Sequence, residues 1–134
     1  MGMTVEMIEK KGPHFPNPLR DAKGADFEAV VSKVVDVKKE LGYVFDAITL
    51  SRKKLKGRVP LIGFVGAPWT LMSYMIEGGG SKFFYFVKGF IYKYPTESKR
   101  LLQRIAEVCV DFLVEQVRAG AQVGPAGGSV MAFT

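Results

Sequence analysis

A tyrosine and the end of an apolar run are the first candidates for chemistry in this sequence. Tyr74 follows the apolar run 59–66 and lies on a segment with helical spacing. A phenol beyond the carboxyl end of a strand can hydrogen-bond a ligand carboxylate, or it can pack in the core with its hydroxyl bonded elsewhere. Phe64 and Gly66 end the run. They can line the same pocket, or they can fill the interior and form a tight turn.

The sequence holds one histidine, His14, and one cysteine, Cys109. One cysteine excludes an internal disulfide and a cysteine-based zinc cage, and one histidine excludes every metal site or triad that needs more than His14. Cys109 lies on the flank of an apolar helical stripe, which favours a small buried side chain over a nucleophile. The glycines at 78–80 lack the lysine of a phosphate loop, which favours a helix break. We therefore expect no metal site.

The charge balance favours an anionic partner without choosing its class. The 134 residues include 19 basic and 13 acidic side chains, giving a net charge of +6 and a pI near 9.5. Phosphates, carboxylated small molecules, nucleic acid and an acidic membrane surface all fit. The basic cluster 52–58 favours a solvated helix end, and no apolar run approaches the roughly 18 to 20 residues of a membrane span. Glu6 and Glu9 interrupt any signal peptide, so we expect a cytosolic or organelle-interior protein.

Composition and periodicity predict one domain with several helices. Apolar residues make up 48% of the chain and charged residues 24%, a globular profile. Helical spacing predicts a short helix over 27–33 and longer ones over 41–55, 68–77, 81–94 (capped by Ser81) and 95–118, the last ending at 119–120. Residues 4–8 predict a short strand. The prolines within 12–18 predict an extended loop that is neither helix nor strand.

The apolar run 59–66 predicts a strand buried on both faces of a parallel sheet. Pro68 suits the first turn of the helix that follows it. Helix, buried strand and helices in this order are typical of an α/β fold, yet two strands are too few to be covered on both faces. The Gly- and Ala-rich residues 123–134 predict an irregular tail instead of a further strand. We therefore expect the chain to be part of a larger sheet.

Several segments in order resemble the uroporphyrinogen decarboxylase family. The resemblance is carried chiefly by GFVGAPWTL at 63–71 and YMIEGGG at 74–80. GPHFPNPLR at 12–20, the segment 40–64 and LVEQVRAGAQ at 113–122 match further parts of the family pattern in the same order. The likeness covers residues 1–122, and we expect residues 123–134 to lie outside it.

The resemblance implies an α/β fold, a partial (β/α)8 TIM barrel covering roughly its second to fourth β/α units. Members of this family bind their substrate at the carboxyl ends of the strands. They remove carbon dioxide from the four acetate side chains of uroporphyrinogen III and give coproporphyrinogen III, without metal or organic cofactor. The resemblance thus implies a tetrapyrrole substrate, no nucleic acid, no membrane, and a homodimer at full length. It implies a cytoplasmic or plastid location.

Of the family's site residues, only the tyrosine has a matching position here, Tyr74. The family's arginine-rich motif, aspartate, serine and histidine fall outside the matching residues, whereas Arg20, Asp46 and His14 match other parts of the pattern. The resemblance therefore implies that Tyr74 contacts the substrate. Phe64 and Gly66 are candidate lining residues from their place at the end of the run, and the alternative of interior filling and a tight turn stays open for them. It also implies that this chain alone is inactive.

Two other functions stay open at this stage. A decarboxylase-like methyltransferase shares the fold but needs a zinc site, and neither His14 nor Cys109 has ligand-spaced partners. A small basic module that binds an anionic partner requires the chain to be a stable monomer by itself. Stoichiometric zinc would support the first alternative, and a cooperative monomeric melt with salt-sensitive nucleic-acid binding would support the second.

Overall fold

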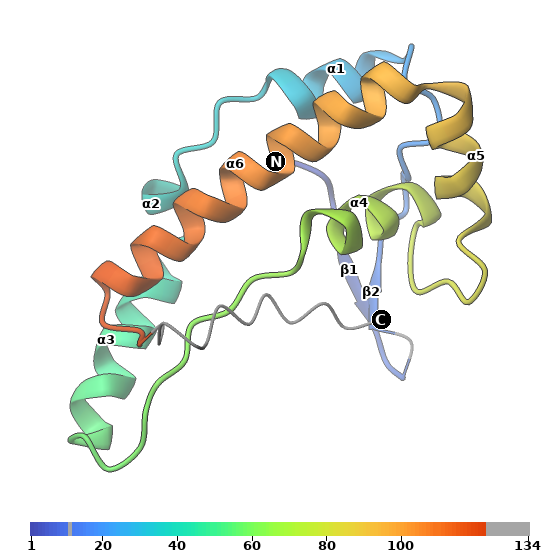
Figure 1. Ribbon diagram of the computed structural model, residues 1–134. Helices are drawn as coiled ribbons and strands as arrows, with labels where there is room; N and C mark the ends of the chain where they lie inside the picture. The colour runs from blue at the N-terminus through green and yellow to red at the C-terminus, as the bar shows by residue number, and fades with distance from the viewer. Residues whose placement is uncertain (11, 123–134) are drawn as a thin grey trace. The chain divides into compact units, whose positions relative to one another are not determined.

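The computed structural model describes residues 1–10 and 12–122, which form two compact units. The first unit contains residues 1–34 and 68–105, and the second contains residues 35–67 with the described residues from 106 on. Helix α6, Pro95–Arg118, begins in the first unit and ends in the second, and Figure 1 labels it with the other elements. The expected tail 123–134 lies outside the described residues.

The first unit contains a two-stranded antiparallel ribbon. Strand β1, Glu6–Ile8, pairs with β2, Gly12–His14, with Met7 opposite Pro13. The strand expected at 4–8 is confirmed over its second half, but the prediction that 12–18 contains no strand is wrong. Proline is tolerated in β2 because each strand of such a ribbon has an unpaired edge, where a missing amide hydrogen costs no ladder bond.

Three complete helices belong to the first unit: α1, Ala25–Ser32; α4, Pro68–Glu77; and α5, Tyr85–Lys93. Pro68 is the first residue of α4, as expected, and Gly78 ends that helix with a φ of +89°. The prediction that Ser81 caps the next helix is wrong. Its Oγ accepts a hydrogen bond from the Phe84 amide at 3.0 Å, in a turn that precedes α5.

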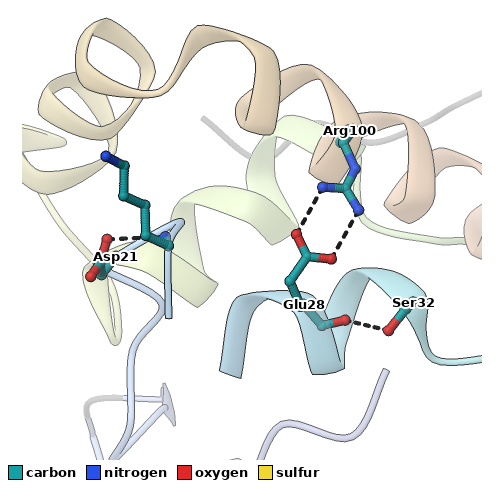
Figure 2. A network of polar contacts seen from close by, with 5 residues as sticks. Asp21, Glu28, Ser32 and Arg100 are labelled. Atoms are coloured by element: carbon teal, nitrogen blue, oxygen red, sulfur yellow. Dashed lines mark hydrogen bonds and ion pairs between the residues drawn. The ribbon is translucent and has the colours of Figure 1, made fainter. Parts of the chain in front are cut away.

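The core of the first unit gathers side chains from all of its helices. The Phe27 ring of α1 lies 6.1 Å from the Phe90 ring of α5, measured between centroids. Beside them α1 lies along α6, where Arg100 donates two hydrogen bonds to the Glu28 carboxylate at 2.8 and 3.0 Å (Figure 2). The side chains with less than 2% exposure are Phe27, Met72, Ile76, Val87, Leu101 and Ile105.

The second unit contains α2, Val37–Glu40, α3, Gly42–Leu55, and the end of α6. The helix expected over 41–55 is confirmed, and Lys56 ends it in the left-handed region at a φ of +50°. The Phe45 ring of α3 lies 5.9 Å from the Phe112 ring of α6. Thr49 Oγ1 and Arg52 Nη1 donate to the carbonyls of residues 119 and 120 at 3.0 and 2.8 Å, which satisfies acceptors that a helix leaves open at its carboxyl end.

The apolar run 59–66 is extended, but it is not the buried strand that its composition predicts. Within the described residues it forms one isolated parallel bridge, between Ile62 and Gln122. Ile62 and Phe64 are 66% and 61% exposed. A strand is buried on both faces only when it lies inside a sheet that helices cover above and below, and the described part of the chain supplies only the single bridge. The described residues therefore combine helices with a small amount of strand, and none of their helices is long and apolar enough to cross a membrane.

Candidate functional site

Tyr74 lies on α4 of the first unit, at the border of its buried face. Met72, Ser73, Met75 and Ile76 are buried, whereas Tyr74 is half-buried. Its carbonyl accepts the Gly78 amide at 2.9 Å, so the residue belongs to the last regular turn of the helix. This arrangement leaves Tyr74 partly exposed in a regular turn of the helix.

The carboxyl end of α4 is held by the segment that follows β2. The Phe15 amide donates to the Gly78 carbonyl at 2.8 Å, and the Leu19 amide donates to the Met75 carbonyl at 2.9 Å. A free helix end leaves such carbonyls unbonded, so these two bonds fix the turn that carries Tyr74. A β-carbon on Gly78 would lie 3.4 Å from the Phe15 carbonyl oxygen, which shows how closely the two segments approach.

Phe64 and Gly66 lie in the second unit, whereas Tyr74 lies in the first. The Phe64 side chain is largely exposed, and Gly66 is half-buried. The Gly66 carbonyl lies 3.7 Å from the Cys109 sulfur, within reach of a weak thiol hydrogen bond. Cys109 is buried, as expected, and its burial raises the pKa of the thiol, so it has the character of an inert core residue.

Gln116 of α6, which no sequence pattern marks, binds the backbone of Phe64. Its side chain is 4% exposed. Gln116 Nε2 donates to the Phe64 carbonyl at 3.0 Å, and Oε1 accepts from the Phe64 amide at 3.0 Å. The two bonds satisfy both backbone groups of Phe64, as a neighbouring strand would. The only sequence signal for this contact was a glutamine on the buried face of a helix, and no spacing rule distinguishes such a glutamine from a solvated one.

Of the other polar candidates, His14 and Arg20 belong to the first unit and Asp46 to the second. His14 is half-buried in β2, and Asp46 is exposed on α3. Arg20 stacks on the Phe86 ring, with its guanidinium carbon 3.7 Å from the ring centroid. It also lines a cavity of about 620 Å³. That cavity is lined by Arg20, Phe83, Tyr85, Phe86, Lys88, Gly89, Phe90, Lys93 and Tyr94.

Asp21 is an ionised structural residue beside that cavity. The Lys23 backbone amide donates to its carboxylate at 3.1 Å, and the Tyr94 hydroxyl donates to it at 2.8 Å. These bonds, the backbone bond first, lower the pKa of Asp21 below its usual value. The Tyr94 side chain in turn raises the pKa of Lys93. Asp21 therefore stays charged at neutral pH, and it is not suited to donate a proton.

The donor set fits no metal within the part of the chain that the structure describes. No group of three or more His, Cys, Asp or Glu side chains there is placed to hold a metal ion. The chemistry that these residues offer is a phenol, an exposed aromatic ring and cationic side chains. Such groups bind and orient carboxylates and rings.

Comparison with known proteins matches nearly the whole chain to one family. The family model described as "Uroporphyrinogen decarboxylase (URO-D)" matches residues 1–124. Uroporphyrinogen decarboxylases of Dictyostelium discoideum and Homo sapiens are 55% and 53% identical over 122 residues, and that of Schizosaccharomyces pombe is 51% identical over 123 residues. These alignments cover 91%, 91% and 92% of this chain and 33%, 32% and 33% of the relatives, respectively. The chain thus spans about a third of the length of the curated relatives it matches.

Proposed function

Because this chain belongs to the uroporphyrinogen decarboxylase family, we propose that it forms part of a carboxy-lyase that converts uroporphyrinogen III to coproporphyrinogen III. The observation that carries the proposal is the family match over residues 1–124, with identities above 50% to curated decarboxylases. It favours decarboxylation over the methyltransferase and the basic binding module that the sequence left open.

The proposed fold is one third of a (β/α)8 barrel, roughly its second to fourth units, formed by residues 1–122. The extended run 59–66, its parallel bridge to Gln122 and the helix that begins at Pro68 support a barrel strand followed by its helix. In such a barrel the side chains at the carboxyl ends of the strands line the substrate pocket. Phe64, Gly66 and Tyr74 come at or after that end of the run.

The reaction sets clear requirements for the protein. A proton adds to a pyrrole ring carbon, the bond to the carboxylate carbon breaks, and the electron pair returns to the ring as carbon dioxide leaves. A second proton then takes the place of the carboxyl group on the exocyclic carbon, while the ring loses the first. The protein must hold the substrate carboxylates and stabilise the positive charge on the ring. The family resemblance implies that no metal or organic cofactor takes part.

Within this scheme Tyr74 binds the substrate. Its phenol donates a hydrogen bond to a carboxylate of the macrocycle, a charge-assisted bond. Phe64 offers an exposed ring to the face of a pyrrole, and Gly66 allows the backbone to approach it closely. The proton donor and the groups that hold the remaining carboxylates come from parts of the family pattern outside residues 1–122. A homodimer and a cytoplasmic or plastid location remain predictions from the resemblance.

A chimeric enzyme tests the proposed function. Residues 1–122 of this chain replace the matching 122 residues of the Dictyostelium discoideum relative, and coproporphyrinogen formation is measured after oxidation to the fluorescent porphyrin. We expect turnover by the chimera. A folded chimera that binds uroporphyrinogen but releases no carbon dioxide would contradict the proposal.

The role of Tyr74 is tested in the same chimera by Tyr74→Phe. Loss of one hydrogen bond to a charged group is expected to raise KM about tenfold, since such bonds contribute about 1.5–3 kcal/mol. Tyr92→Phe is the matched control, because Tyr92 is 89% exposed on α5 of the same unit. Equal kinetic constants for the Tyr74 variant and the unmodified chimera would show that Tyr74 does not bind the substrate.

A further inference from the structure

The buried amide of Gln116 holds a stretch of backbone that has no neighbouring strand there among the described residues. A glutamine side chain loses its hydration when it is buried, and this loss is offset only if both its oxygen and its nitrogen find partners. Gln116 finds both in Phe64, at 3.0 Å each, although an apolar side chain would fill the same volume without that desolvation cost. The paired bonds distinguish this residue from a packing residue.

The backbone beside Phe64 is shaped to admit this amide. A β-carbon on Gly63 would lie 2.8 Å from Gln116 Oε1 and 3.1 Å from the Ala121 β-carbon, so a side chain there would displace the amide. The start of the run is held separately. Leu61 accepts the Gln122 amide at 2.6 Å and donates to Gln122 Oε1 at 3.2 Å. One glutamine thus holds each end of residues 61–64.

We propose that Gln116 is a positioning residue for substrate binding, and this inference rests on the proposed function. By closing both hydrogen bonds with Phe64, it fixes the direction in which the exposed Phe64 ring leaves the backbone. It also fixes the path of the chain into Gly66. A ring placed in advance loses less freedom when a pyrrole ring packs against it, so the effect is on substrate affinity more than on the chemical steps.

The test uses the chimeric enzyme with Gln116→Met, which keeps the volume and removes both hydrogen bonds. We expect KM for uroporphyrinogen to rise about tenfold while kcat changes less than threefold. Gln122→Met is the matched control, since it removes an amide bond to Leu61 and leaves Phe64 bonded. We expect its KM to stay within twofold of the unmodified value even where the melting temperature falls.

Gly63→Ala is expected to disrupt the same contact between Gln116 and Phe64 without changing Gln116. Its β-carbon displaces the amide, so we expect a similar rise in KM, and the double variant with Gln116→Met is expected to add little. The inference is overturned if Gln116→Met leaves KM unchanged, or if Gln122→Met raises KM as much.

Failure of the proposed function is distinguishable from failure of this inference. If the unmodified chimera gives no product, the proposed function is rejected. The role of Gln116 is then tested by the hydrogen-exchange rate of the Phe64 amide. Faster hydrogen exchange of that amide in Gln116→Met, at unchanged exchange of the Leu61 amide, supports positioning. An unchanged Phe64 exchange rate overturns it.

Discussion

At the scale of single residues, hydrogen bonds to two carboxylates connect segments of the first unit. Arg100 of α6 holds the Glu28 carboxylate of α1 through two parallel hydrogen bonds, and the Lys23 amide and the Tyr94 hydroxyl hold Asp21; Figure 2 shows the Glu28 and Asp21 carboxylates. The Arg100 bond lowers the pKa of Glu28, and the two bonds to Asp21 lower its pKa. Both groups are open to solvent, so salt screens them and their contribution is modest.

These pKa shifts predict a loss of stability in acid. A carboxyl whose pKa is lower in the folded state stabilises the fold above its unfolded pKa, near 4, and this contribution is lost as the pH falls through the folded value. Glu28→Gln should therefore reduce the drop in melting temperature of the chimeric enzyme between pH 7 and pH 3. Glu9→Gln is the control, because Glu9 is exposed and takes part in no described ion pair. An unchanged drop in Glu28→Gln would show that the Arg100 pair does not stabilise the fold.

At the scale of elements, the sequence predicted the helices well and the strands poorly. Pro68 and the glycines at 78–80 mark the ends of α4 locally, so its bounds could be predicted. The burial of the run 59–66 depends on neighbouring strands, and no local pattern specifies them. Strand β2 was missed because Pro13 breaks an interior strand but is tolerated at an open edge.

In the candidate site, too, residues with a local signal could be predicted and residues that depend on distant segments could not. The family resemblance marked Tyr74, and the end of the apolar run marked Phe64. Gln116 gave no such signal, because a single glutamine in a helix is most often a solvated residue and its partner is a backbone 52 positions away in sequence. Only the folded arrangement brings that backbone to it.

The end of α4 provides a stability test at this scale. Gly78 has a φ of +89°, a conformation that costs a residue with a β-carbon about 1–2 kcal/mol. Gly78→Ala should lower the free energy of unfolding by about that amount in urea titrations of the chimeric enzyme. Gly89→Ala is the control of opposite sign, since Gly89 lies inside α5 with open space around its α-carbon, and alanine favours a helix by up to about 1 kcal/mol. A Gly78→Ala variant as stable as the unmodified chimera would contradict the left-handed helix end.

At the scale of the whole molecule, the family resemblance expected from the sequence is confirmed by the match over residues 1–124. The fold is confirmed only in its mixture of helices and strands, and the barrel units remain a proposal. Large apolar side chains are exposed in both units, and in a complete barrel such surfaces would be covered by neighbouring strands and helices. They include Ile62, Phe64, Phe83, Tyr85 and Phe86.

The most direct test of this account is an assay of the 134-residue chain by itself with uroporphyrinogen. In the proposed scheme Tyr74 binds a carboxylate, but the family's aspartate and arginine-rich motif have no match in the chain. We therefore predict no coproporphyrinogen from the chain alone, although the same residues support turnover within the chimera. Sustained product formation by the isolated chain would contradict the assignment of its residues to one third of a barrel.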